Sequence, residues 1–265
     1  RIAFFFILSG FILSLNFKQK IIESKLSFKK FWTDRIARMY PLHLITFCFA
    51  IPLSLHVFSS DIESWMGAFC CNLLLIQSFI PNPKYYFSFN GVSWSISCQM
   101  FFYFMFPFII KFSHKYKMLA RCWWIPILLI PISAFFIPQN FYEAFYYINP
   151  LFRLVSFSVG ILVYKLYENG RFNSLFNSWK KSTFMEVASV VIFLVFLALH
   201  KTIPHVYRYS CYYWIPTVLV IFVFSHQKGY LSSLLSRKLF LSLGEMSFAF
   251  YLVHQLVIRY VVVLN

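Results

Sequence analysis

Long apolar segments separated by short polar ones dominate this sequence of 265 residues. About 20 predominantly apolar residues are enough for an α-helix to cross the hydrocarbon core of a bilayer. Eight candidate segments lie at about 2–17, 39–58, 92–110, 123–137, 150–166, 184–200, 211–225 and 246–264. Hydrophobic side chains make up 60% of the chain, more than a soluble domain of this length needs. The sequence therefore predicts an all-α fold, a polytopic membrane helix bundle with about eight transmembrane helices.

Segment 64–80 is the ambiguous one, because it is apolar enough to cross but contains Asn72 and Gln77. If it does not cross, four basic loops share one side of the membrane and together carry eighteen Lys or Arg residues. These loops are 18–38, 111–121, 165–183 and 226–240. The opposite loops then carry three, namely Lys84, Lys201 and Arg208. If it does cross, the eighteen are split seven against eleven, and the excess of positive charge on one side disappears. We therefore expect an interfacial or re-entrant helix on the outer side.

The same charge pattern predicts the cellular setting. The formal net charge is +16, but the Lys and Arg residues lie in short loops between apolar segments, which indicates a membrane surface and not a nucleic acid. We expect a multi-pass protein of the inner (cytoplasmic) membrane. The chain begins at Arg1 and ends at Asn265, both almost inside apolar segments. The prediction is a single domain, 1–265, truncated at both ends, with about ten transmembrane helices in the full protein.

The six cysteines form no Cys-x-x-Cys pair, and most of them lie inside apolar segments. A cysteine in that setting acts as a small hydrophobic residue. The sequence therefore predicts neither a disulfide framework nor a metal site.

A polar face is expected on the helix predicted at 92–110. Ser95, Gln99 and Tyr103 stand at positions i, i+4 and i+8, so they share one side of a Phe-rich helix. The amide of Gln99 can donate a hydrogen bond to an oxyanion or hold a hydroxyl, although it cannot act as a base. The alternative is hydrogen bonding between helices, which contributes about 0.6–2 kcal/mol per contact in membranes. Trp94 is expected to anchor the helix at the membrane interface.

Two arginines within the first basic loop have a spacing that can hold a phosphate group. Arg35 and Arg38 stand at i and i+3, which places them on one helix face. A guanidinium binds phosphate oxygens through two parallel hydrogen bonds, so this face can hold a phosphate group. The alternative is that both residues only anchor the protein at the membrane side whose loops carry the excess of Lys and Arg.

Other polar residues fall within apolar helices. His254 lies eight residues into the last predicted span and shares a face with Ser247 and Tyr251, which makes it a site candidate or a neutral imidazole bonded to another helix. Arg153 is close to the outer end of its span, where its guanidinium can reach the interface, so it is either an anchor or a site residue. Ser9 and Gly10 are small and are expected to let a neighbouring helix approach closely.

Five stretches resemble the acyltransferase-3 family of integral membrane acyltransferases, which O-acylate cell-envelope glycans, lipids and related acceptors. Residues 4–11 resemble its Phe-Phe-x-Leu-Ser-Gly-Phe helix, and residues 31–41 resemble its Arg-x-x-Arg-Ile-x-Pro loop. Residues 94–103 are similar to Trp-Ser-Leu-Ser-x-Glu-x-x-Phe-Tyr. Residues 150–160 follow the pattern of the middle helix, and residues 243–254 resemble a late Gly-x-x-Ser-Tyr-x-x-Tyr-Leu-x-His segment. The order and spacing of these matches cover nearly the whole chain.

The chain departs from the family pattern in three places. Position 99 is Gln where the family usually has Glu, and position 156 is Ser where Glu is common, so a carboxylate role at either position is in doubt. The family's first helix, with the Arg and His of its catalytic signature, is expected before Arg1. The resemblance therefore implies that the principal catalytic His lies upstream of this sequence.

The resemblance implies an O-acyltransferase that moves an acyl group, expected to be acetyl, from acyl-CoA to a hydroxyl of a cell-envelope glycan or lipid-linked saccharide. It would work in the bilayer without a metal or a nucleic-acid partner. The expected catalytic residues are His254, Gln99 and Arg153, and the expected coenzyme A ligands are Arg35 and Arg38. The expected substrate-binding residues are Trp94, Ser95, Tyr103, Ser247 and Tyr251. The alternatives are a transporter or flippase of glycan material, which would consume no acyl-CoA, and a catalytically inactive family member.

Overall fold

A computed structural model describes residues 2–116 and 124–264, and within these ranges the regular elements are all helical. The long helices are α1 (Ile2–Ile22), α2 (Phe28–Ala50), α6 (Trp94–Lys115), α8 (Pro150–Glu168), α9 (Trp179–Leu199) and α13 (Lys238–Leu264). The shorter ones are α3 (Leu55–Ser60), α4 (Ile62–Leu73), α5 (Pro83–Tyr86), α7 (Trp124–Ser133), α10 (His205–Tyr209), α11 (Trp214–Ser225) and α12 (Tyr230–Leu235). The all-α prediction is confirmed for the described residues.

Five described helices are long and apolar enough to cross a bilayer: α1, α6, α8, α9 and α13. A sixth span is obtained if α2 and the helical stretch Pro52–Ser60 are counted together as one helix bent by 50°. The segments predicted at 123–137 and 211–225 instead form α7 and α11, of 10 and 12 residues. Helices of that length reach about 15–18 Å, which is short of a hydrocarbon core of about 30 Å. The chain is thus a multi-pass helical membrane protein, but the predicted count of eight spans is not shown.

The ends of the helices differ from the expected ones at the first basic loop. Residues 18–38 were expected to form a loop, but α1 continues to Ile22 and α2 begins at Phe28, which leaves a connection of residues 23–27. Ser27 caps α2, because its hydroxyl accepts a hydrogen bond from the backbone N–H of Lys30. The basic residues of this stretch therefore lie on helices, where long side chains can reach solvent while the backbone stays hydrogen-bonded.

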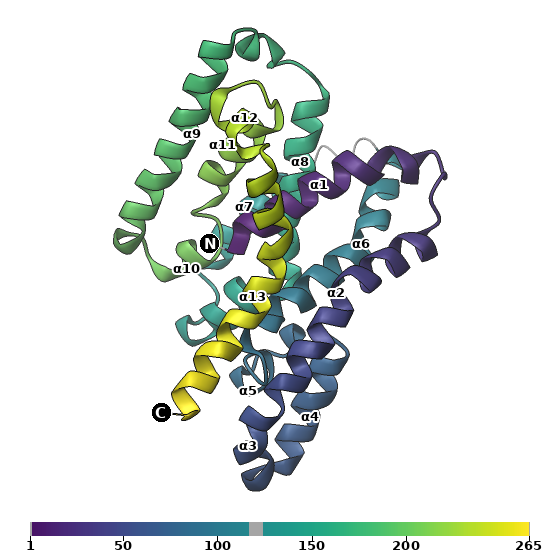
Figure 1. Cartoon of the computed structure of the whole chain (residues 1–265), viewed down its shortest axis with the longest axis vertical. Helices are drawn as coiled ribbons and strands as arrows, with labels where there is room; N and C mark the ends of the chain where they lie inside the picture. The colour runs from purple at the N-terminus through teal and green to yellow at the C-terminus, as the bar shows by residue number, and fades with distance from the viewer. Residues whose placement is uncertain (1, 117–123, 265) are drawn as a thin grey trace.

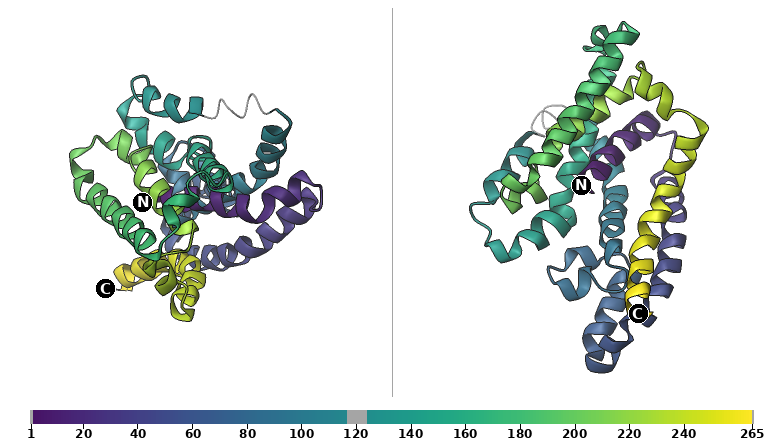
Figure 2. Two further views of the ribbon diagram at one scale, coloured as in Figure 1. Left: turned by 90° about the horizontal axis from the view of Figure 1, so that it is seen from above. Right: turned by 60° about the vertical axis from the view of Figure 1, so that its left-hand side comes forward.

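The connections 23–27, 169–178 and 226–237 fall within three of the four predicted basic loops. They lie toward the upper end of the molecule, whereas α3, α4, α5 and the C-terminal end of α13 lie toward the lower end (Figures 1 and 2). This arrangement agrees with the expectation that the basic loops share one side of the membrane. The fourth loop, 111–121, lies partly outside the described residues.

The segment 64–80 lies at the lower end and does not form a spanning helix. Helix α4 ends at Leu73, and the chain turns back through Leu75, whose φ is 56°. The two polar residues that made this segment ambiguous are fully buried within the lower end of the molecule. Asn72 donates to the carbonyl of Ala68 and to the Ser88 hydroxyl, and Gln77 donates to the Ser93 hydroxyl. These bonds satisfy both amides inside the protein, so this apolar segment can be buried there without spanning the bilayer.

Two glycines bring α1 and α8 into backbone contact. An added Cβ at Gly10 would lie 2.1 Å from the carbonyl oxygen of Phe157, and one at Gly160 would lie 1.9 Å from that of Ile7. The close approach predicted for Gly10 is therefore confirmed. Beside this contact, the Phe102 ring packs edge-on against Phe6 at 5.0 Å between centroids, so α6 completes a three-helix core with α1 and α8.

Candidate functional site

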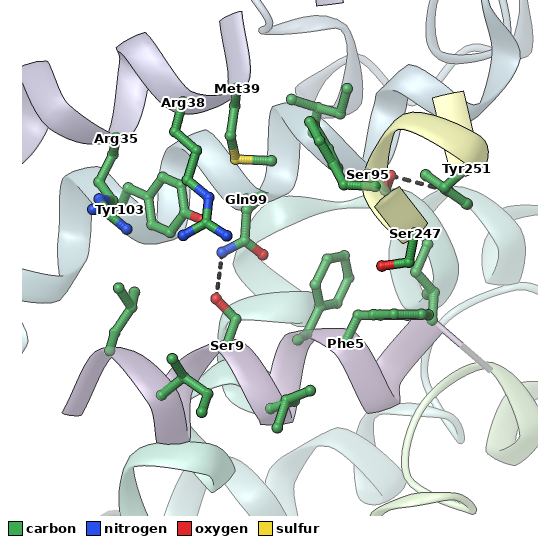
Figure 3. Close-up of a pocket in the computed structure, with 17 residues that line it drawn as sticks. Phe5, Ser9, Arg35, Arg38, Met39, Ser95, Gln99, Tyr103, Ser247 and Tyr251 are labelled. Atoms are coloured by element: carbon green, nitrogen blue, oxygen red, sulfur yellow. Dashed lines mark hydrogen bonds between the residues drawn. The ribbon is translucent and has the colours of Figure 1, made fainter. Parts of the chain in front are cut away.

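A cavity of about 310 Å³ lies between α1, α2, α6 and α13 (Figure 3). Its polar lining comes from four separate parts of the chain and consists of Ser9, Arg35, Arg38, Ser95, Gln99, Tyr103, Ser247 and Tyr251. Its apolar lining consists of Ile2, Phe5, Phe6, Leu8, Ile12, Leu13, Met39, Ile96 and Phe248. Pockets of this size with a few polar groups among apolar ones are typical of small-molecule sites. We call it the central cavity.

One end of the central cavity is cationic. Arg35 and Arg38 extend from the third turn of α2 toward Gln99 and Tyr103 (Figure 3). The Arg35 guanidinium lies 5.0 Å from the centroid of the Phe17 ring, and its Nε is buried without a hydrogen-bond partner in the described part of the chain. Neither arginine forms a salt bridge with a described carboxylate. Both guanidinium groups are therefore available to an anionic ligand.

The middle of the central cavity is formed by one face of α6. Ser95, Gln99 and Tyr103 all line it, as their spacing predicts. Gln99 is mostly buried, and its Nε2 donates to the hydroxyl of Ser9 on α1. An amide nitrogen carries two protons, so this contact leaves one for a further acceptor. The backbone carbonyl of Tyr103 accepts from the Trp32 indole at 3.2 Å, which fixes this turn of α6 against α2.

The other end of the central cavity is formed by α13. The Tyr251 hydroxyl lies 3.0 Å from the Ser95 hydroxyl, which itself donates to the Val92 carbonyl at 2.9 Å. The Tyr251 hydroxyl also lies 3.4 Å from the Val92 carbonyl oxygen, so these contacts join α13 to the start of α6 (Figure 3). Ser247, one turn earlier on α13, donates to the carbonyl of Gly244 at 2.6 Å.

Three of the ten candidate residues lie outside the lining of the central cavity. Trp94 packs against the rings of Phe6 and Tyr147, so it is buried and is not an interface anchor. Arg153 is 2% exposed and donates from Nε to the Tyr147 carbonyl at 2.8 Å, so the expected reach to the interface is wrong. Its position in the first turn of α8 faces the core of the bundle.

His254 is the third candidate outside the lining. Its Nδ1 lies 2.6 Å from the carbonyl oxygen of Tyr251 in the same helix, and its ring is nearly parallel to that of Phe250. A carbonyl can only accept, so Nδ1 carries the proton of this bond and Nε2 keeps a lone pair when the ring is neutral. The expected common face with Ser247 and Tyr251 therefore does not bring the imidazole into the cavity, and its role stays a prediction.

The structure also shows what replaces the family's usual residues at the two departures. Gln99 makes the contact to Ser9 described above. Ser156 is buried and accepts from the Trp214 indole at 2.9 Å, which ties α8 to α11 away from the central cavity. The role of Ser156 visible in the structure is therefore packing.

Sequence reasoning missed the polar lining residue Ser9, the apolar lining residues such as Met39, and one buried polar cluster. Ser9 was read as a packing residue, although a hydroxyl in a Phe-rich helix is itself a signal for a polar partner. Met39 gives no such signal, because an apolar residue after two arginines is also expected from packing alone. The cluster includes His43, which is fully buried and donates from Nε2 to the Asn72 carbonyl at 3.0 Å.

Comparison with known proteins gives two kinds of match. The family model described as "Acyltransferase domain" matches residues 1–264. The acyltransferase MdmB of Streptomyces mycarofaciens is 29% identical over 98% of this chain, which spans 68% of that protein. The protein named "Putative acetyltransferase ORF330", from Acidianus two-tailed virus, is 24% identical over 86% of this chain and 65% of its own length. No solved structure matches the chain.

Proposed function

Because the chain belongs to the acyltransferase family whose model matches residues 1–264, and is thus an acyl-transferring enzyme of the membrane, we propose that it takes an acyl group from acyl-CoA. The expected group is acetyl, and the expected acceptor is a hydroxyl of an envelope glycan or a lipid-linked saccharide. The observation that carries this proposal is the central cavity, in which two unpaired guanidinium groups stand at one end of an apolar pocket. Acyl-CoA likewise carries phosphate groups toward one end of the molecule and the acyl chain at the other.

Arg35 and Arg38 would hold the phosphates of the donor. Each can form two parallel hydrogen bonds to phosphate oxygens, and charge-assisted bonds contribute about 1.5–3 kcal/mol each. The apolar residues of α1 that line the cavity, Phe5 and Leu8 among them, would then pack along the acyl group and its linker. The two arginines and the apolar wall would thus bind the donor, and the hydroxyl and amide groups of α6 would remain for the chemistry.

In the transfer step, the acceptor oxygen attacks the thioester carbonyl carbon, and its proton passes to a base. The C–S bond then breaks, and the thiolate takes up a proton. Gln99 and Tyr103 would donate to the oxyanion that forms on the carbonyl oxygen, because both line the middle of the cavity and both carry hydrogen-bond donors. Ser95, Ser247 and Tyr251 would position the acceptor at the α13 end. No metal is part of this scheme.

We propose His254 as the base offered by the described residues. Its Nε2 lone pair is free while Nδ1–H donates to the Tyr251 carbonyl, but the ring must change rotamer to reach the cavity. Arg153 and Trp94 do not line the cavity, so we propose that they position its wall. The Tyr147 ring lies between them, 5.2 Å from the Arg153 guanidinium and 4.9 Å from Trp94.

The test is acyl transfer in membrane vesicles that contain the full reading frame and labelled acetyl-CoA. We compare the wild type with the double variant Arg35→Gln/Arg38→Gln and with Lys29→Gln/Lys30→Gln, a matched pair on α2 outside the cavity lining. The arginine variant should raise the KM for acetyl-CoA at least tenfold, and the lysine variant should change it less than twofold. His254→Ala should lower kcat and leave this KM in place.

Two outcomes would contradict the proposal. Equal KM values for the arginine and lysine variants would remove the phosphate role of Arg35 and Arg38. No transfer of label from acetyl-CoA or longer acyl-CoA donors to any alkali-labile ester would instead favour the catalytically inactive family member.

A further inference from the structure

A second cavity of about 400 Å³ is lined by residues of α3, α4, α5 and α13. In Figure 1, α3, α4, α5 and the C-terminal end of α13 lie at the lower end of the molecule. The lining of this cavity includes Asp61, Trp65, Lys84, Phe87, Ser88 and Arg259. None of these residues lines the central cavity. The charge pattern of the loops places this end of the chain on the outer side of the membrane. We call it the lower cavity.

The lower cavity is lined by hydrogen-bond donors, hydrogen-bond acceptors and aromatic rings. Asp61 accepts from the backbone N–H of Ser64 at 3.1 Å and lies 3.5 Å from the Lys84 ammonium. The hydrogen bonds from Ser64, reinforced by Lys84, hold the pKa of Asp61 below its usual range, so the carboxylate is charged at neutral pH. Further hydroxyls line the wall at Ser54, Ser60, Ser64 and Ser88.

Two aromatic features complete this wall. Phe87 is 39% exposed, so a ring face is open to a ligand, while the Trp65 indole is held by its hydrogen bond to the Ser54 hydroxyl at 2.9 Å.

Arg259 is held by the carbonyl of Phe89, and its second guanidinium nitrogen is 3.5 Å from the carbonyl of Leu53. Its charge is thus fixed at the wall by backbone carbonyls.

The balance of these groups indicates the class of ligand. Asp61, Lys84 and Arg259 give the lining charges of both signs, and the aromatic rings beside them give it apolar surface. A saccharide presents hydroxyls that both donate and accept, together with C–H faces that pack against aromatic rings, and the lower cavity offers a partner for each.

Buried polar atoms without a partner lie between the two cavities. Asn90 Oδ1 and Gln255 Oε1 are buried and make no hydrogen bond among the described residues. Asn90 follows the lining residues at 87–89, and Gln255 lies one turn before Arg259 and one turn after Tyr251 of the central cavity. A buried acceptor without a partner costs about 1–3 kcal/mol, so both atoms would gain from a donor such as water or a ligand hydroxyl.

A hydrogen-bonded chain runs beside these atoms. Ser88, which lines the lower cavity, accepts from Asn72, and Asn72 in turn accepts from Ser93 at 3.1 Å. Gln77 donates to Ser93 at 3.2 Å. Ser93 is two residues from Ser95 of the central cavity. Along α13, Tyr251 of the central cavity and Arg259 of the lower cavity are eight residues apart, or about 12 Å of helix axis.

We propose that the lower cavity binds a saccharide, with Asp61 and Lys84 bonding its hydroxyls and Phe87 packing against its ring. If the proposed acyl transfer holds, this saccharide is the acceptor, and its reactive hydroxyl reaches the central cavity past Asn90 and Gln255. The binding site itself does not depend on the acyl-transfer proposal, because it needs no acyl donor.

The test is binding of soluble saccharides to the full chain in phospholipid nanodiscs, measured by saturation-transfer NMR without acyl-CoA. Detergents with sugar headgroups are avoided, because they would compete. The probes are glucose, galactose, N-acetylglucosamine and cellobiose. The variants are Asp61→Asn and Phe87→Ala. Asparagine caps a helix as well as aspartate does, so the first variant keeps the start of α4.

Matched controls separate the site from general effects. Glu63→Gln removes an exposed carboxylate of α4 that does not line the cavity, and Phe136→Ala removes a Phe that is 81% exposed elsewhere. We expect at least one saccharide to bind the wild type and both controls, and at least tenfold weaker binding to Asp61→Asn and Phe87→Ala. The melting temperature of each variant reports whether it is folded.

Three results would overturn the proposal. The first is no binding of any of these saccharides to the wild type at millimolar concentration. The second is equal binding to the wild type and to folded Asp61→Asn and Phe87→Ala. The third is binding of sn-glycerol 1-phosphate in preference to every saccharide, which would indicate a lipid headgroup. Acyl transfer from acetyl-CoA measured in parallel shows whether only the saccharide site, or also the proposed function, has failed.

Discussion

The contact between α1 and α8 makes a sharp prediction, because two glycines allow it. An added Cβ at Gly160 would lie 1.9 Å from the Ile7 carbonyl oxygen and 2.9 Å from the backbone N of Phe11. An ordinary carbon–oxygen contact is about 3.3–3.6 Å, so Gly160→Ala requires α1 and α8 to separate by more than 1 Å. The atoms that clash belong to the backbone and cannot turn aside, as a side chain could.

The expected cost follows from this geometry. Inserting one methyl group into a packed contact costs about 1–3 kcal/mol, and we expect the upper part of this range because two helix backbones must move together. For a chain of this size, about 2–4 °C of melting temperature is lost per kcal/mol. Gly160→Ala should therefore melt roughly 5–10 °C below the wild type. Gly10→Ala should do the same, and the double variant should lose less than the sum, because one separation of the helices relieves both clashes.

The assay is thermal unfolding of the purified protein, followed by size-exclusion chromatography of heated samples. Gly244→Ala is the matched control, because it also replaces a glycine within a helix but an added Cβ meets no atom within 4 Å. It should raise stability by about 0.5–1 kcal/mol through helix propensity alone. If Gly160→Ala behaves like Gly244→Ala, the reasoning that the two backbones touch is refuted.

Three further predictions follow from other contacts. Glu186 on α9 is buried and accepts hydrogen bonds from backbone N–H groups within 229–232, so Glu186→Ala should lower the free energy of unfolding by about 3 kcal/mol or more. Glu186→Gln should lower it less, and equal melting temperatures of the two variants would contradict this reasoning. Burial lowers the pKa of His226, so the folded state resists its protonation; stability should fall as pH drops below about 6.5, and His226→Phe should flatten this part of the pH profile of the melting temperature. A double-mutant cycle of Ser95→Ala and Tyr251→Phe should show a coupling of about 0.6 kcal/mol, and additive effects would show that the 3.0 Å contact contributes nothing.

The local pattern of the sequence predicted several parts of the site. The 3.6-residue period of a helix placed Ser95, Gln99 and Tyr103 on one face, and all three line the central cavity. The same period paired Arg35 with Arg38, and the small size of Gly10 indicated a close helix contact. Each of these statements depends on neighbours within two or three turns, which is the range over which a sequence specifies geometry by itself.

The tertiary structure decided what lies beyond that range. Sequence placed Arg153 at an interface, but the packing of α8 buries it against Tyr147. Sequence placed His254 on the face of Tyr251, but its ring bonds to its own helix and lies outside the cavity.

The lower cavity shows the same limit most clearly, because it joins Asp61 to Arg259 across almost two hundred residues. Apolar runs, the positive-inside bias and helical period determined that this chain forms membrane helices, and determined which side chains share a face. Which faces meet depends on backbone approach at glycines and on the fit of many side chains at once. That information is held in contacts between distant parts of the chain and is not carried by any one segment.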